Sequence, residues 1–335
     1  MRSSHGLFFL MTFVFSLSAV AKPLQFKQSN ALSSKSSNFT ETQLKVSGDP
    51  TSCDVRSNVE LKEQNDVTAF PSTLPKGCQN VAIDGDLYIG GDLESKSNIS
   101  DLTALGVIQS VKGRLIVSYT SSLIDFKGFK DLQNVGADFV VAQNSGLTSL
   151  DGLDELQQVG GTLSIANNAN LTSLIGMPKL ATVKNLSIQR DKALTSLTWL
   201  PSFQSISGYV EVSSNTTLSS LNGLYVKSQQ IGSLAIVDNS KLTNIDALSR
   251  LKNVEKSINI SDNEALSSLS SLSNITPLQP NKDIPSKSLT LEYDKSAKPL
   301  LTDCKGVCNY LTWVKSLNTD NLPQQCQNTI NHCWQ

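Results

Sequence analysis

Histidine and net charge are both scarce in this chain. The two histidines, His5 and His332, lie near its ends, so the middle of the chain has none for a His-based catalytic triad. The formal net charge is only −1. Without a basic excess the chain lacks the attraction that draws proteins onto nucleic acid or anionic lipid, and we expect neither as a partner.

Apolar runs long enough to cross a membrane are missing as well. The run in residues 7–17 is too short to span a bilayer. Because it follows Arg2 and precedes a small-residue pattern ending at Ala21, we expect residues 1–21 to be an export signal, with a retained membrane anchor as the alternative. The last residues lack the hydrophobic tail of a lipid-anchor signal. The sequence therefore predicts a secreted, extracellular protein with no membrane span and no lipid anchor.

Cysteines are few, even in number and confined to the two ends of the chain. In an oxidising compartment they predict disulfides. Cys53 and Cys78 are the natural N-terminal pair, whereas the pairing of the other four stays open. A zinc site formed by those four with His332 is the alternative, but the spacing does not give two close cysteine pairs, so we expect no metal and no cofactor. The six are Cys53, Cys78, Cys304, Cys308, Cys326 and Cys333.

A short strand pattern recurs through the middle of the chain. Each copy is a triplet whose first and third members share one side of a strand, which predicts one short strand per coil with those two members facing inward and the middle one outward. Between Leu115 and Ile258 the copies stand 24, 24, 23, 24, 24 and 24 residues apart. Such a period predicts stacked coils that bury a core together. The triplets begin at Leu87, Leu115, Phe139, Leu163, Leu186, Val210, Leu234, Ile258 and Leu289.

Apolar residues at three-residue steps and a polar column complete each coil. The steps, as in Leu147, Leu150, Leu153, Leu156 and Val159, suit tight corners and single helical turns. Five residues after the first triplet position comes a column that we interpret as structural, because stacked amides can satisfy backbone groups at a bend. A row of metal or sugar ligands is the alternative interpretation. The column is Thr120, Asn144, Asn168, Asp191, Asn215, Asn239 and Asn263.

The coils divide the chain into five parts. After the signal, residues 22–52 are polar and predict a flexible arm. Residues 53–78 predict an N-terminal cap with a weak helical pattern over 59–65. The repeat solenoid covers 79–291, and 292–335 predicts a Cys-containing C-terminal cap with a short helix over 308–317.

The segment Cys78 to Ile89 resembles the start of a receptor L domain, the leucine-rich-like module of insulin and epidermal growth factor receptor ectodomains. The recurring strand, Asn, Leu-x-x-Leu and Val-x-Gly order is similar to that of secreted and cell-wall-associated fungal proteins built on this module. The resemblance implies a mainly β fold, a single-stranded right-handed β-helix or leucine-rich-repeat-like solenoid, with a role in recognition or cell-surface organisation. The chain departs from the receptors because it has no cysteine-rich module, transmembrane helix or kinase.

The middle residues of the triplets and their neighbours supply the candidate site. Asp86, Arg114 and Asp138 form the one charged cluster on the expected outward face, with Tyr88 and Tyr119 nearby. Aromatic rings beside hydroxyl and amide groups can bind sugars or anchor a protein interface. A surface ion-pair ladder is the alternative for the charged row, and a polysaccharide-active enzyme on a β-helix is the alternative for the whole chain.

Sequons restrict which part of this face is open. We expect glycosylation at exposed sites, with Asn215 a poor acceptor because it belongs to the inward column. Glycans at Asn185 and Asn259 would block the C-terminal half of the strand face, so we expect a partner on the N-terminal coils. The candidate acceptors are Asn38, Asn98, Asn170, Asn185, Asn259 and Asn274. We therefore expect a non-enzymatic recognition, cell-wall or matrix protein for a protein or glycan partner, with a purely structural wall protein as a further alternative.

Overall fold

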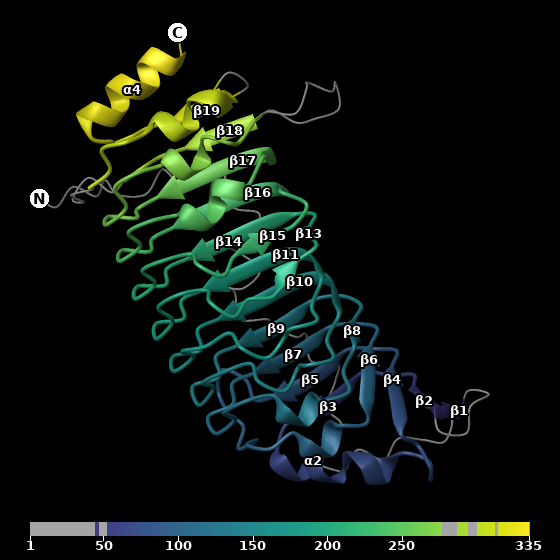
Figure 1. Cartoon of the computed structure of the whole chain (residues 1–335). Helices are drawn as coiled ribbons and strands as arrows, with labels where there is room; N and C mark the ends of the chain where they lie inside the picture. The colour runs from purple at the N-terminus through teal and green to yellow at the C-terminus, as the bar shows by residue number, and fades with distance from the viewer. Residues whose placement is uncertain (1–43, 47–51, 277–286, 294–299, 312–313, 335) are drawn as a thin grey trace, which may run out of the picture. The chain divides into compact units, whose positions relative to one another are not determined.

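The computed structural model describes residues 44–46, 52–276, 287–293, 300–311 and 314–334. The expected signal, most of the expected arm and the sequon at Asn38 lie outside these residues. The described part is mainly β, as predicted, and nearly all of its strands join one long sheet that is parallel except at its first strand. Figure 1 shows the strands lying side by side from β2 to β19, an arrangement consistent with a β-solenoid.

The triplets form one row of parallel strands. Leu87 pairs with Leu115, and Leu115 pairs with Phe139, so first triplet members lie on neighbouring strands. We call the chain from one such strand to the next a coil. The row consists of β3 (Val59–Leu61), β5 (Leu87–Gly90), β7 (Leu115–Ser118), β9 (Phe139–Ala142), the later parts of β10 (Gln158–Ala166), β11 (Thr182–Gln189), β14 (Tyr209–Ser213), β16 (Gln230–Val237) and β17 (Asn253–Ser261), then β18 (Lys287–Thr290) and β19 (Val314–Asn318).

A second row of strands lies just before the first in most coils, so the prediction of one strand per coil was wrong. Val159 ends a three-residue series that predicts tight corners, but its backbone is extended and pairs with Val135 and Val183. Long strands bend from one row into the other, with register shifts after Val159 and Ile231. The row consists of β2 (Ser52–Val55), β4 (Asn80–Ile83), β6 (Ile108–Val111), β8 (Asn134–Val135), β13 (Ser205–Ile206) and the first parts of β10, β11, β16 and β17.

Two further pairings lie outside these rows. The first strand, β1 (Leu44–Val46), pairs antiparallel with β2, although it falls within the segment expected to be a flexible arm. A separate pair, β12 (Ser202–Phe203) and β15 (Tyr225–Val226), joins two neighbouring coils at a corner.

Apolar residues from the triplets and from the three-residue steps fill the interior. Leu147, Leu150, Leu153, Leu156 and Val159 are each at most 1% exposed, and full burial of such a side chain stabilises the fold by roughly 1.5–3 kcal/mol. Short 3₁₀ helices form several of the corners, as the three-residue step predicts. They are η3 (Thr103–Leu105), η4 (Lys127–Phe129), η5 (Asp246–Arg250), η6 (Ser270–Leu272) and η7 (Lys305–Val307).

Three disulfides lie at the two ends of the sheet. Cys53 bonds to Cys78, as predicted, and the open pairing at the other end is Cys304 with Cys326 and Cys308 with Cys333. Because all six sulfurs are in disulfides, no thiolate remains for the alternative zinc site. In the chain-entropy model each such bridge stabilises the fold by about 3 kcal/mol.

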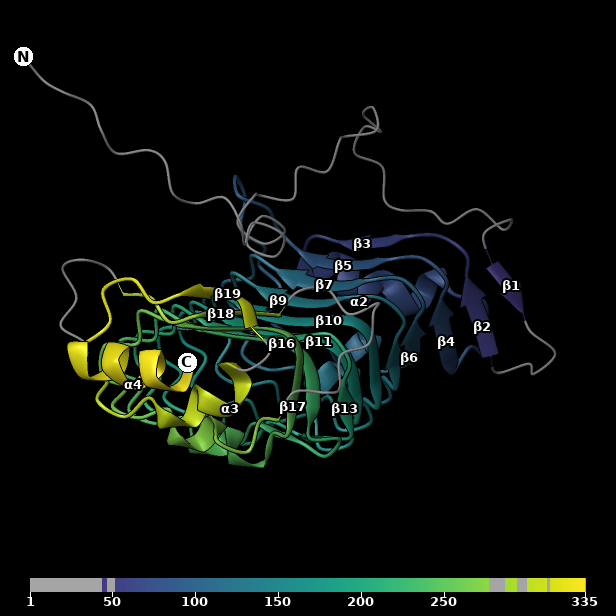
Figure 2. The same ribbon diagram turned by 90° about the horizontal axis from the view of Figure 1, so that it is seen from above.

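The helices at the ends differ from those predicted. The pattern over 59–65 predicted a helix, but its start is β3, and the helix α2 spans Gln64–Ala69, followed by η2 (Phe70–Thr73). The helix predicted over 308–317 is only α3 (Cys308–Leu311), because the chain then extends as β19 and fills hydrogen bonds at the edge of β18. The last helix, α4 (Gln324–Trp334), carries Cys326 and Cys333 and lies at the β19 end (Figures 1 and 2). No described helix is long and apolar enough to cross a membrane.

Candidate functional site

The residues predicted to contact a partner come from three neighbouring strands. Asp86, Arg114 and Asp138 each stand directly before a triplet strand, and because β5, β7 and β9 pair in register, they form one row. Tyr88 is the second residue of β5. Tyr119 follows β7 in the left-handed region, at φ 56°, where the chain turns toward the interior.

Asp86 and Arg114 form an ion pair across neighbouring strands. The guanidinium donates from Nη2 at 2.7 Å and from Nε at 3.1 Å to Asp86 Oδ2. Burial by itself would raise the pKa of Asp86, but the hydrogen bonds and charge of Arg114 outweigh it, so this pKa lies below its ordinary value. About a third of the Arg114 side chain is exposed. The pair is therefore ionised, held in one geometry and open to contact.

Asp138 does not complete a symmetrical triad with this pair. Its Oδ1 accepts the backbone N–H of Thr162 at 2.7 Å, on the side away from Arg114. The hydrogen bond to Asp86 is the main cause that raises the pKa of Arg114, and the charge of Asp138 makes a smaller contribution in the same direction. Arg114 is thus hydrogen-bonded to Asp86 and also interacts electrostatically with Asp138.

The carboxylates in this row also have a structural role that the sequence did not reveal. Asp86 Oδ1 accepts the backbone N–H of Arg114 at 2.7 Å, as Asp138 does for Thr162. The residue before each donor is glycine, and a Cβ on Gly113 would lie 2.4 Å from Asp86 Oδ1. Each carboxylate therefore caps the start of the next strand through Oδ1, and the Oδ2 of Asp86 accepts from the Arg114 guanidinium. A test of either charge has to preserve the cap.

Tyr88 is anchored beside the ion pair. Its hydroxyl donates to the carbonyl of Gly91, and Ser118 Oγ donates to the phenol oxygen at 3.3 Å. Burial raises the pKa of Tyr88, and the charges of Asp92 and Glu60 add to that effect. The phenol is neutral at ordinary pH, and its half-buried ring lies on the same strand face as Arg114.

A second polar group on this face was missed by the sequence analysis. Period-two alternation assigned Glu211 to the outward side, but it is only 5% exposed. Ser213 Oγ donates to Glu211 Oε1 at 3.2 Å, and Gln189 Nε2 donates to Ser187 Oγ at 2.7 Å. Burial raises the pKa of Glu211, and hydrogen bonds from Ser213, Gln189 and Ser187 offset only part of the effect.

The outward side of the sheet is therefore less exposed than alternation predicted. Alternation gives the side on which a residue lies, not how much solvent reaches it. Serine side chains on this side are small, so residues of the two neighbouring strands cover most of their surface. The buried middle members of triplets are Ile116, Ser164, Ser187 and Glu211.

The polar column lies in the interior, with every member fully buried. From Asn144 onward, one side-chain oxygen of each member accepts the backbone N–H of the column residue one coil earlier, as when Asn144 N donates to Asn168 Oδ1 at 3.1 Å. Thr120 Oγ1 donates to Asn144 Oδ1. The amide nitrogens donate to strand carbonyls, as from Asn144 to Val117 at 2.9 Å. This geometry leaves the column with no surface for a ligand. It is Thr120, Asn144, Asn168, Asp191, Asn215, Asn239 and Asn263.

The sequons differ in how accessible their amide nitrogens are. Asn98, Asn170 and Asn274 are exposed, whereas Asn215 is fully buried. Asn185 is half-buried: its Nδ2 donates to Thr162 Oγ1 at 3.1 Å, and its Oδ1 accepts the backbone N–H of Tyr209. A glycan on Asn185 would compete with the first of these bonds.

The charged row consists of one ion pair and two backbone caps. Asp86 is ionised and bonded to Arg114, and Asp138 caps Thr162. No group of three His, Cys, Asp or Glu side chains suited to a metal ion occurs among the described residues. An ion pair with a phenol and hydroxyls beside it can recognise a polar ligand.

Comparisons of this chain with protein-family models, curated proteins and solved structures found no match. The resemblance to receptor L domains therefore rests on the sequence motifs alone.

Proposed function

We propose that this chain is a secreted, non-enzymatic recognition protein of a cell wall or extracellular matrix, and that its solenoid presents the N-terminal strands to a protein or glycan partner. We further propose that the fold is a leucine-rich, receptor L-domain-like solenoid of coils of about 24 residues. Three disulfides support an extracellular setting, because such bonds persist in oxidising compartments.

The observation that carries the proposal is the Asp86–Arg114 pair next to Tyr88. Both charges are fixed by paired strands, so binding a partner costs little side-chain entropy. The Arg114 fork and the Tyr88 ring are side-chain types that dominate binding energy at interfaces. A rigid, partly exposed group of this kind suits selective contact better than bulk structural support.

The test is a binding screen of the purified full chain against extracellular glycans and cell-surface proteins, with turnover of polysaccharides measured in parallel. The proposal expects saturable binding without product formation. Loss of binding in Tyr88→Ala would place the contact on β5.

Asp86→Asn and Asp138→Asn separate recognition from catalysis. Both keep the Oδ1 acceptor that caps the next strand and remove the charge, and Asp86→Asn also removes the acceptor of the Arg114 guanidinium. Polysaccharide cleavage by the wild type that these variants abolish would establish the enzyme alternative. Retention on wall material without saturation would establish a purely structural role.

A further inference from the structure

Trp199 is unusual both in its solvent exposure and in its backbone conformation. It is 63% exposed, although large aromatic side chains are usually buried. Its φ is +80°, a conformation that is an outlier for a bulky residue. The corresponding corners of neighbouring coils carry glycine at positive φ, namely Gly152, Gly176 and Gly223.

The neighbouring coils show what this corner demands. A Cβ on Gly176 would lie 1.9 Å from the Leu150 carbonyl oxygen, and a Cβ on Gly223 would lie 2.0 Å from that of Leu197. Other coils avoid the conflict with 3₁₀ helices, such as η5 and η6. The coil that contains Trp199 keeps the positive-φ turn and places an indole there, which costs backbone energy without adding a core contact. Strain of this kind is typical of ligand-contacting positions.

The chain carries no charged side chain within four residues of Trp199 on either side, and it has hydroxyl groups there. Ile175 and Gly176 occupy this corner in the preceding coil, and Asn222 and Gly223 occupy it in the following one. Ser196 Oγ and Thr198 Oγ1 bond to each other at 2.9 Å beside Trp199.

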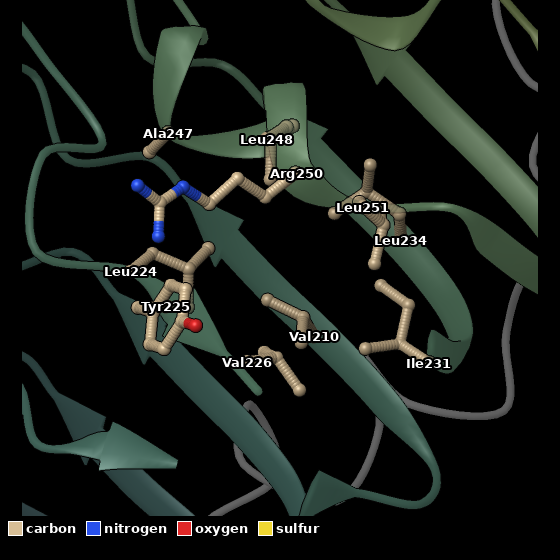
Figure 3. Close-up of a pocket in the computed structure, with 10 residues that line it drawn as sticks. All are labelled: Val210, Leu224, Tyr225, Val226, Ile231, Leu234, Ala247, Leu248, Arg250 and Leu251. Carbon is tan, nitrogen blue, oxygen red and sulfur yellow. The ribbon is translucent and has the colours of Figure 1, made fainter. Parts of the chain in front are cut away.

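The next two coils add a second aromatic group at this edge. Ser202, three residues after Trp199, pairs with Tyr225, and the Arg250 guanidinium lies over the Tyr225 ring at 5.4 Å (Figure 3). The cavity beneath this pair is about 20 Å³, room for about one water, and its other lining residues are mostly apolar. The edge therefore offers an exposed surface for stacking and no deep pocket.

We propose that Trp199 is the stacking platform of a neutral-glycan site on this edge, separate from the strand face. The apolar C–H face of a pyranose ring packs on an indole, while its hydroxyls find Ser, Thr and Asn partners around it. The uncharged residues that flank Trp199 along the chain favour a neutral sugar over an acidic one. This site stands on Trp199 and its corner, so it does not depend on the contacts of Arg114 or Tyr88.

The test compares Trp199→Gly and Trp199→Phe with the wild type. Glycine is the residue of the flanking corners, so Trp199→Gly should fold as well as the wild type, which thermal unfolding checks. The probes are short soluble β-glucan, chitin and α-mannan oligosaccharides, measured by calorimetry and by tryptophan fluorescence.

We expect saturable binding of at least one probe, weakened about tenfold or more in Trp199→Gly, partly kept in Trp199→Phe and unchanged in Ile124→Ala, a control at another exposed apolar side chain. Equal affinity in Trp199→Gly, or no binding of any probe by the wild type, would overturn the proposal. So would loss of a protein partner in Trp199→Gly while no glycan binds. If Tyr88→Ala still binds the partner found in the screen, that result would count against the strand-face function. It would leave the Trp199 site standing.

Discussion

Asn168 donates two hydrogen bonds to one carboxylate oxygen of Asp191, from its backbone N–H at 2.8 Å and from its side-chain amide at 3.2 Å. The other oxygen, Oδ2, is buried without a hydrogen-bond partner. At Asn215, the next position of the column, the corresponding atom is an amide nitrogen that donates to the Ile188 carbonyl at 3.0 Å. Asp191 can supply such a donor only when it is protonated.

Replacement of Asp191 by asparagine should therefore stabilise the protein in a pH-dependent way. Burial raises the pKa of Asp191 from 3.8 to about 7, with the hydrogen bonds from Asn168 opposing the rise. Between these values the folded state holds a proton that the unfolded state has lost, so stability falls as pH rises through that window. The difference converts to roughly 4 kcal/mol.

Urea unfolding of Asp191→Asn and wild type at a series of pH values measures the effect. At pH 8 the variant should be several kcal/mol more stable, and near pH 4 the two should be close. A difference that stays constant with pH would show that Asp191 does not titrate in this range.

Asn239→Ala should destabilise the protein through the same column. The change removes an oxygen that accepts from the Asn215 backbone and an amide that donates to the Val212 carbonyl. It leaves both groups buried without partners, at a cost of about 2–4 kcal/mol. Asn222→Ala is the control, because Asn222 is exposed, and its unfolding midpoint should stay near that of the wild type.

Replacement of two corner glycines by alanine should change the free energy of unfolding by very different amounts. Gly176 has φ 133° and no room for a Cβ, whereas the nearest atom to a Cβ on Gly106 is the flexible end of Lys130, at 3.2 Å. Gly176→Ala should lower the free energy of unfolding by about 3 kcal/mol or more, and Gly106→Ala by about 1 kcal/mol or less. Similar losses in both variants, measured by denaturant unfolding, would contradict this account of the corner.

Glycopeptide mapping of the secreted protein should follow the accessibility of each amide nitrogen. We expect modification at Asn98, Asn170 and Asn274, and none at Asn215, whose Nδ2 bonds to the Ile188 carbonyl and to Asn239. Asn185 should carry less glycan than the exposed sites, because it is half-buried, with its Nδ2 bonded to Thr162 on one neighbouring strand and its Oδ1 to Tyr209 on the other. Full occupancy of Asn215 would mean that glycans are added before this coil closes.

The parallel strands of the fold could be predicted from the sequence, because the triplet pattern that marks them is local and recurs along the chain. The triplets at Leu115 and Phe139 fall on paired strands, and the steps from Leu147 to Val159 are buried. The second strand row was missed, because apolar residues such as Val159 ended a three-residue series and did not alternate. The end helices were misplaced where strand pairing outweighed local helical pattern, as at Val59.

The site was less predictable than the fold. Register places Asp86, Arg114 and Asp138 in one row, so their proximity could be anticipated. The caps that Asp86 and Asp138 make, the burial of Glu211 and the strained backbone of Trp199 depend on contacts between coils. Such contacts leave no pattern within a single coil.

The measurement that tests the central claim most directly is the affinity of Arg114→Gln for the partner recovered in the binding screen. The substitution keeps the backbone N–H that donates to Asp86 and removes only the guanidinium. Because the ion pair is partly exposed, 34% at Arg114 and 27% at Asp86, its loss should change the free energy of unfolding by about 1 kcal/mol or less. Lys179→Gln, which breaks an exposed pair with Glu155, is the matched control. We predict that Arg114→Gln weakens binding about tenfold or more while Lys179→Gln binds as the wild type does. Unchanged affinity in Arg114→Gln, with the fold intact, would contradict recognition through the N-terminal strands.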